Sequence, residues 1–163
     1  GTINGVAVTT RTPATLGYRQ VATVAAVSKA GATLTYRSLA PACALNGQQI
    51  TPLTGVGECA ISVTSAGNAT AAPVTVILPI RLTAGTQTLG SFAVAQSLKA
   101  YSKTNLPTET NFGEKVTYKA VGSCSVVRSV LTMRKGKCDI SATSKARNGL
   151  YEALNLKLTT TSK

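Results

Sequence analysis

Gly57-Glu58-Cys59-Ala60-Ile61-Ser62-Val63 aligns without a gap to Gly136-Lys137-Cys138-Asp139-Ile140-Ser141-Ala142, later in the same chain of 163 residues. In both stretches apolar residues occupy every second position from the cysteine onward. Alternation with a period of two is the pattern of a β-strand that has one buried face. The two stretches therefore predict the same cysteine-bearing strand in two copies of one structural unit.

The match extends upstream of this strand. Thr15-Leu16-Gly17 recurs as Thr88-Leu89-Gly90, and Leu34-Thr35-Tyr36-Arg37-Ser38 corresponds to Val116-Thr117-Tyr118-Lys119-Ala120. In the second copy, alternation places Val116 and Tyr118 on one face of the strand and the flanking polar residues on the other. Because these matches keep their order along the chain, they indicate an internal repeat.

The repeat also continues downstream of the cysteine strand. An Asn/Gly turn follows in each copy, and a closing strand is expected after it, at residues 74–82 and 154–160. Residues 83–87 read as a short linker between the copies. We therefore predict two domains, residues 1–84 and 85–163, of a size typical of small modules.

Composition favours an all-β fold. Hydrophobic residues make up 44% of the chain but aromatic residues only 4%, with no Trp, so the core must be built from Val, Leu, Ile and Ala. Thr and Val suit a pleated, half-buried surface. Short strands separated by Gly, Pro, Asn and Ser are typical of β-sandwiches. The longest apolar runs fall far short of the ~20 residues of a membrane-spanning helix, and no membrane span is predicted.

Four cysteines occur without a single histidine. Cys43 and Cys59 lie 16 residues apart in the first copy, and Cys124 and Cys138 lie 14 apart in the second, whereas zinc sites use closer pairs. One disulfide in each copy is the better interpretation, and it places the protein in an oxidising compartment, secreted or at the cell surface. We expect each bridge to tie neighbouring strands near one end of its sandwich and to contribute roughly 3 kcal/mol.

A tyrosine-bearing strand, a first cysteine, the Gly-x-Cys-x-Ile-Ser stretch and an Asn/Gly turn together resemble bacterial immunoglobulin-like repeats of extracellular proteins. The resemblance covers nearly the whole chain, twice. It implies two tandem immunoglobulin-like sandwiches that serve as a spacer, stalk or adhesive module in a surface-exposed array, and it brings no catalytic residue to this chain. Antibody domains differ, since they have a core Trp and widely separated cysteines.

Few residues could carry chemistry. Without histidine the chain has no Ser-His or Cys-His nucleophile pair. Among five acidic residues, Glu109 and Glu114 form the one pair that a hydrolase could use. A solvated polar loop is the favoured interpretation of that pair. The sequence therefore predicts no enzyme, no metal and no cofactor.

Charge is unevenly distributed. The net charge of +12 divides into +4 for residues 1–84 and +8 for residues 85–163. Arg128, Arg134, Lys135 and Lys137 surround the turn that leads to Cys138. If this turn projects, its cations could bind polyanions such as an acidic polysaccharide. The alternative is a solvated turn whose cations blunt a sheet edge. No aromatic residues interleave with these cations, which argues against single-stranded nucleic acid as a partner.

The N-terminal segment allows a second mode of interaction. Residues 3–10 could complete the sheet of another copy or of a neighbouring repeat, with Ile3, Val6 and Val8 as the inserted side chains. The alternative, which is favoured, is that the segment is the first strand of its own domain. The leading functional hypothesis is a structural or adhesive module of a surface protein, as a stalk, spacer or filament subunit, with assembly by strand addition as its specific version. Polyanion binding is the second hypothesis.

The tyrosines divide into two groups. Tyr36 and Tyr118 occupy matched positions in the two copies, so we expect them to pack in the cores with bonded hydroxyl groups. Tyr101 and Tyr151 have no such match and stay open as sugar-stacking candidates.

Overall fold

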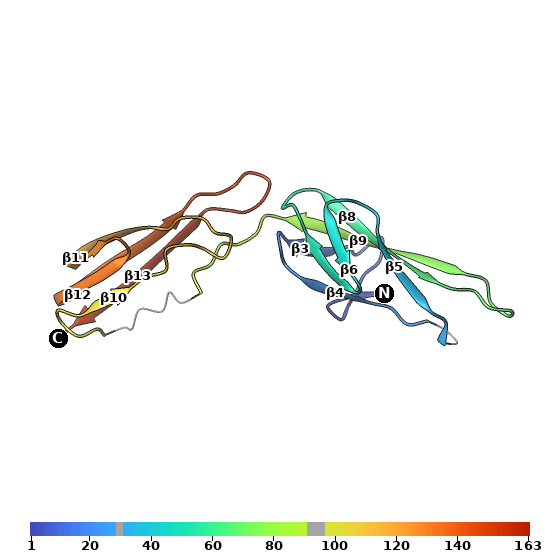
Figure 1. Ribbon diagram of the computed structural model, residues 1–163, viewed down its shortest axis with the longest axis horizontal. Coiled ribbons are helices and arrows are strands. Elements are labelled where there is room, and N and C mark those ends of the chain that lie inside the picture. Colours follow the sequence, from blue (N-terminus) through green and yellow to red (C-terminus); the bar gives the residue numbers. More distant parts are fainter. Residues whose placement is uncertain (29–30, 91–96) are drawn as a thin grey trace. The chain divides into compact units, whose positions relative to one another are not determined.

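The computed structural model describes residues 1–28, 31–90 and 97–163, and β-strands are its regular structure (Figure 1). The chain divides into two compact units. Unit 1 comprises Gly1–Gly85 together with Asn148–Tyr151, and unit 2 comprises Thr86–Arg147 together with Glu152–Lys163. Within the described ranges, no helix has the length and hydropathy needed to cross a bilayer.

Unit 1 is a sandwich of two sheets. The first has the order β2-β1-β4-β7-β6, formed by β1 (Thr2–Ile3), β2 (Val6–Ala7), β4 (Ala22–Ala25), β6 (Cys43–Asn46) and β7 (Gln49–Pro52). The second has the order β3-β9-β8-β5, formed by β3 (Ala14–Gly17), β5 (Leu34–Ser38), β8 (Glu58–Ser65) and β9 (Val74–Thr83). Val24 and Ile50 from the first sheet, and Ile61, Leu78 and Ile80 from the second, are fully buried in one core.

The strands near the two ends of unit 1 run parallel. β3 pairs with the last strand, β9, in a register that joins Ala14 to Ile80 and Gly17 to Thr83. The backbone N–H of Tyr18 continues the ladder by donating to the carbonyl of Thr83 at 3.1 Å. All other strand pairs of this unit are antiparallel in the described part of the chain.

Unit 2 is organised around one long hairpin. β11 (Thr117–Val127) and β12 (Val130–Ser144) pair along their length. The opposite edge of β12 pairs first with β10 (Lys103–Asn105) and then with β13 (Leu154–Ser162). Leu131 and Met133 from the first half of β12 share one core with Ile140 from its second half.

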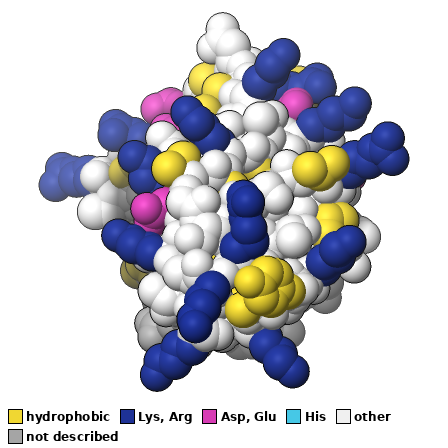
Figure 2. Space-filling view, turned by 90° about the vertical axis from the view of Figure 1, so that its left-hand side faces the viewer, with side chains coloured by type: hydrophobic (Ala, Val, Ile, Leu, Met, Phe, Trp, Pro, Cys, Tyr) yellow, Lys and Arg dark blue, Asp and Glu magenta, His cyan; other side chains and the backbone are white. Residues whose placement is uncertain are grey.

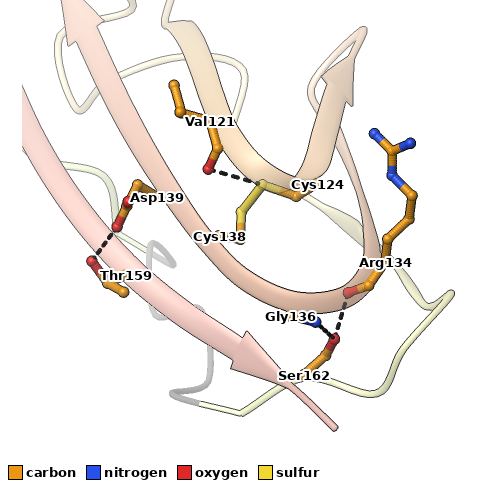
Figure 3. The surroundings of a disulfide bond; sticks show 8 residues. All are labelled: Val121, Cys124, Arg134, Gly136, Cys138, Asp139, Thr159 and Ser162. Carbon is orange, nitrogen blue, oxygen red and sulfur yellow. Dashed lines mark hydrogen bonds between the residues drawn. A yellow bond between two sulfur atoms is a disulfide. The ribbon is translucent and has the colours of Figure 1, made fainter.

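The hairpin bends where its register shifts. Gly122 pairs with Cys138, but the next pair is Cys124 with Met133, so four residues of β12 lie opposite one residue of β11. Figure 3 shows the sharp curve of β12 at this point. A bulge bends its strand, and strands that bend can pass from one layer of a sandwich to the other. The bend therefore lets one hairpin contribute to both sides of the unit 2 core.

Both predicted disulfides are present, and their placement differs between the units. Cys43 on β6 is bonded to Cys59 on β8, which joins the two sheets of unit 1. The expectation that this bridge ties neighbouring strands is wrong, because residues 53–57 carry the chain between the sheets. In unit 2 the bridge does join neighbouring strands, Cys124 on β11 and Cys138 on β12.

The predicted fold class is confirmed as all-β, with two compact units built from β-sheets and one short-range disulfide in each. The predicted closing strands are confirmed as β9 and β13. The boundary between residues 84 and 85 stays a prediction about which residues fold independently.

The N-terminal segment differs from a single extended strand. A turn at Asn4 and Gly5, with φ of 49° and 77°, folds β2 back onto β1. β1 also pairs with β4 of its own sheet. Ile3 and Val8 are buried in the core of unit 1, whereas Val6 is 68% exposed. Alternation alone placed Val6 and Val8 on one face, but Val8 lies just beyond the end of β2 and is buried, while Val6 within β2 is exposed.

Candidate functional site

The four residues of β12 that oppose Ser123, residues 134–137, form a basic bulge: Arg134, Lys135, Gly136 and Lys137. Gly136 adopts a φ of +127°, which disfavours a side chain, and a Cβ at this residue would lie 2.5 Å from the Ser123 hydroxyl. Glycine is therefore the residue type that this backbone allows.

The basic bulge is held on two sides, by β13 and by the disulfide. On one side, the Ser162 hydroxyl of β13 donates to the carbonyl of Arg134, and the N–H of Gly136 donates to the Ser162 oxygen at 3.2 Å (Figure 3). On another side the disulfide fixes Cys138, the next residue, to β11. Gly136 and Lys137 also pair with the end of β13. A defined backbone thus presents the cationic side chains.

Three of the four predicted cations lie in this bulge and the fourth does not. Arg134, Lys135 and Lys137 are exposed, and the Arg134 side chain points away from the disulfide in Figure 3. Arg128 instead forms the hairpin turn with Ser129, where both residues have positive φ. Six strand residues span roughly 20 Å, so Arg128 belongs to a different part of the surface.

Two further lysines lie on the outer face of the unit 2 sheet. Ser141 of β12 pairs with Lys119 on one side and with Lys157 on the other, so the three residues form one row across the sheet. Lys137 projects from the same face of β12, four residues along. Alternation along the strand predicts that Lys119 faces solvent. The sequence did not predict the row, because the row depends on the register between three strands.

Positive charge dominates this outer face. Its acidic residue, Asp139, accepts a hydrogen bond from Thr159 Oγ1 at 2.6 Å. In Figure 2 unit 2 faces the viewer, and Lys and Arg side chains cover much of the surface shown, with few acidic side chains between them. Exposed cations on a fixed backbone could bind a polymer of repeating negative charge.

The two glutamates of the acidic pair have different surroundings. Glu114 forms an ion pair with Arg147, with Nε and Oε1 2.5 Å apart. Glu109 lies opposite Lys115 in an antiparallel bridge. Within the described residues, no three side chains of the kinds that bind metal come together as a potential site. The expected solvated loop fits the exposed Glu109, whereas only 16% of the Glu114 side chain is exposed beside Arg147.

The two matched tyrosines confirm the predicted packing. Tyr36 packs against the unit 1 core, and its hydroxyl accepts a hydrogen bond from Gln48 Nε2 at 3.0 Å. Tyr118 packs in unit 2 and donates to the carbonyl of Pro107 at 2.5 Å. Burial raises the pKa of the Tyr118 hydroxyl above its ordinary value of 10.0. Tyr101 is 77% exposed, while Tyr151 is buried.

No family model matches this chain, and no curated protein matches it. Among solved structures, the chain is similar to the crystal structure of Drosophila N-cadherin EC1-4, with a TM-score of 0.32 and 12% sequence identity. The similarity covers 93% of this chain and 47% of that one, so this chain spans about half the length of the cadherin structure. The resemblance to bacterial immunoglobulin-like repeats stays a prediction.

Proposed function

We propose that this chain is a non-catalytic structural module of a secreted or cell-surface protein, and that it bears tension between its neighbours. The observation that supports the proposal is the parallel pairing of β3 with β9, which clamps the two ends of unit 1 to each other. Unit 2 has a comparable contact, because Ser97 forms a parallel bridge with Thr161. The two disulfides favour an oxidising compartment for this role.

The direction of the strands supplies the mechanical reason. When the ends of unit 1 are pulled apart, the β1–β2 hairpin detaches first and tension then reaches β3. Parallel strands that are pulled in opposite directions slide along each other, so all their hydrogen bonds bear the force together. Antiparallel strands that are pulled at one end open one bond at a time and resist less.

Thr83→Pro is expected to lower the force that unfolds unit 1. The carbonyl of Thr83 accepts from Tyr18, and the N–H of a strand residue points to the same side as its carbonyl, so proline removes a donor from the β3–β9 ladder. One such bond contributes about 1 kcal/mol to stability. Single-molecule stretching from both chain ends measures the force, and Thr83→Val is the matched control because it keeps the N–H.

Wild-type protein and Thr83→Val should show one discrete force peak for each unit, and Thr83→Pro should lose resistance in one of them. With the disulfides reduced, each peak should release about 5 nm more chain, since the bridges enclose separations of 16 and 14 residues. Smooth extension of the oxidised wild-type protein, without peaks, would contradict the tension-bearing role.

A second candidate function is attachment to an anionic polymer, which the basic bulge favours. Its cations are exposed and its backbone is fixed by Ser162 and the disulfide. Anionic polysaccharide is the ligand class we propose, because it offers repeating charges without requiring base stacking. The same surface carries Lys119 and Lys157 in one row.

Replacing Arg134, Lys135 and Lys137 with alanine is expected to weaken heparin binding on the order of a hundredfold, at about 1 kcal/mol for each cation near an anionic surface. Affinity is measured by titration at several salt concentrations. The control replaces Arg11, Arg37 and Arg81 of unit 1 with alanine, which removes the same charge. Equal loss in both triple variants would indicate a response to net charge, and it would exclude the basic bulge as a site.

A further inference from the structure

We propose that residues 74–79 of β9 pair with the same residues of a second copy of this chain, antiparallel and centred on Val76. We call residues 74–79 the free edge. Pairing along it would join the four-stranded sheets of two copies into one sheet of eight strands. The inference goes beyond the tension-bearing role and does not depend on it.

The first observation is that this part of β9 has a partner on one side. β8 pairs with β9 from Val74 to Arg81. On the other side, β3 pairs only with Ile80 to Thr83. In the ranges that the structure describes, no strand pairs with residues 74–79 along that side, so this stretch is a sheet edge.

The hydrogen bonds already present determine which backbone groups face the free edge. The N–H of Leu82 donates to the Gly57 carbonyl at 2.9 Å, toward β8, and the Thr83 carbonyl accepts from Tyr18, on the opposite side. Successive residues of a strand alternate in direction. Thr75 and Ile77 therefore present both N–H and C=O to the free edge. Pro79 has no N–H, and its carbonyl faces the same way.

The side chains of the free edge are apolar and exposed. Val74, Val76 and Ile77 are 57%, 44% and 39% exposed, and residues 74–79 include no charged side chain. Val74 and Val76 lie on the same strand face as the buried Leu78. They line a groove of about 390 Å³ that also includes Ala26, Leu34 and Val63.

Protein edges that stay unpaired usually carry lysine, proline or a bulge. The opposite edge strand of this sheet, β5, carries the exposed Arg37 at its fourth position. The free edge of β9 has only Pro79, at one end. An uncharged stretch rich in β-branched residues is a ready template for strand pairing.

A second copy fits this edge with a closed twofold arrangement. With Val76 opposite Val76 of the other copy, Thr75 lies opposite Ile77 on both sides of the axis. Each Thr75–Ile77 pair exchanges two backbone hydrogen bonds, which gives four bonds in total. Val74 and Val76 of both copies then lie on the groove side of the joined sheet. Such an interface uses the same patch twice and does not extend further.

Charge opposes this association, because each copy carries +12. The pairing should therefore strengthen as salt rises. Polyanion binding by the basic bulge should weaken as salt rises, so the two interactions respond in opposite directions. This difference separates failure of the edge pairing from failure of the polyanion proposal.

The first experiment is analytical ultracentrifugation of the full chain over a concentration series, at low salt and at about 1 M salt, where the screening length is about 3 Å. The wild-type mass should rise from 16.7 kDa toward twice that value, and more readily at high salt. Thr75→Pro should stay monomeric, since its N–H faces the free edge and is not needed by β8. Thr75→Ala is the matched control. Like proline, alanine loses the hydrogen bond between the hydroxyls of Thr75 and Thr64, but it keeps the backbone N–H, so this variant should associate like wild type.

The second experiment tests the register. Val76→Cys should form a disulfide-linked dimer under mild oxidation. The two Val76 residues would form a non-hydrogen-bonded antiparallel pair, in which the Cα atoms lie about 4.5 Å apart. Ile77→Cys is the matched control, since thiols at that position would lie more than about 7 Å apart, beyond disulfide reach. Mass mapping confirms that Cys43–Cys59 and Cys124–Cys138 stay intact.

Wild-type protein that stays monomeric at millimolar concentration and high salt would overturn the proposal. Dimers that persist in Thr75→Pro, or cross-links that form equally at positions 76 and 77, would also overturn it, because they would locate the contact elsewhere. Loss of dimer in Thr75→Pro but not in Thr75→Ala, with a cross-link at position 76, would establish it.

Discussion

Replacing Gly122 with alanine is expected to destabilise unit 2 by roughly 3 kcal/mol. Gly122 has a φ of +104°, where residues with a Cβ are strained. A Cβ here would also lie 2.4 Å from the backbone carbonyl oxygen of Lys137, which cannot move without disturbing the neighbouring disulfide. Equilibrium denaturation, followed by hydrogen exchange and mass spectrometry, measures the loss of stability in unit 2 and in unit 1 separately.

Gly113→Ala is the matched control for this substitution. Gly113 has a φ of +81°, and nothing lies within 4 Å of the position that a Cβ would take. This variant therefore carries the conformational cost alone, about 1 kcal/mol. If the two variants lost equal stability, close approach between β11 and β12 would not be the reason for glycine at position 122.

Removing either disulfide by a pair of Cys→Ala substitutions is expected to cost its own unit about 3 kcal/mol, because an unfolded loop of about 15 residues regains its freedom. Cys43 and Cys138 are almost completely buried, so lost packing adds to the cost. For small domains this is a large share of the total stability. Denaturation followed by hydrogen exchange measures the loss in each unit separately. With alanine at all four cysteine positions, the two losses should add.

The two double variants should also differ from each other. Loss of Cys43–Cys59 releases one sheet of unit 1 from the other, so exchange should rise in both sheets. Loss of Cys124–Cys138 releases the bend of one hairpin, so exchange should rise first at the basic bulge and at the end of β13. An unchanged midpoint for either unit would show that its bridge is structurally dispensable.

The sequence predicted the parts of this structure that depend on local pattern. Period-two alternation around Cys59 and Cys138 identified the strands, and the repeat of these stretches identified two similar units. Cysteine count and spacing led to the correct disulfide pairing. The matched positions of Tyr36 and Tyr118 led to the prediction that both pack in the cores with bonded hydroxyls, since positions that recur in a repeat usually belong to the shared core.

The candidate sites were predicted less completely. The structure places Arg134, Lys135 and Lys137 in one bulge and Arg128 at the hairpin turn, because an extended strand separates residues by ~3.3 Å each. The row of Lys119, Ser141 and Lys157 joins three strands, and no local pattern reports the register between strands. The turn at Asn4 and Gly5 was missed although it has a local signal, because Asn-Gly favours the two-residue turn of a β-hairpin.

By itself, the sequence determined the strand-forming stretches, the repeat, the cysteine pairs and the strong positive charge, because each follows from local periodicity, spacing or composition. Tertiary structure decided that one disulfide joins two sheets and the other joins neighbouring strands. It also decided which cations share a surface, and that residues 74–79 have a free edge. These features depend on strand register and on the layer in which each strand lies, and both arise from contacts between residues far apart in the chain.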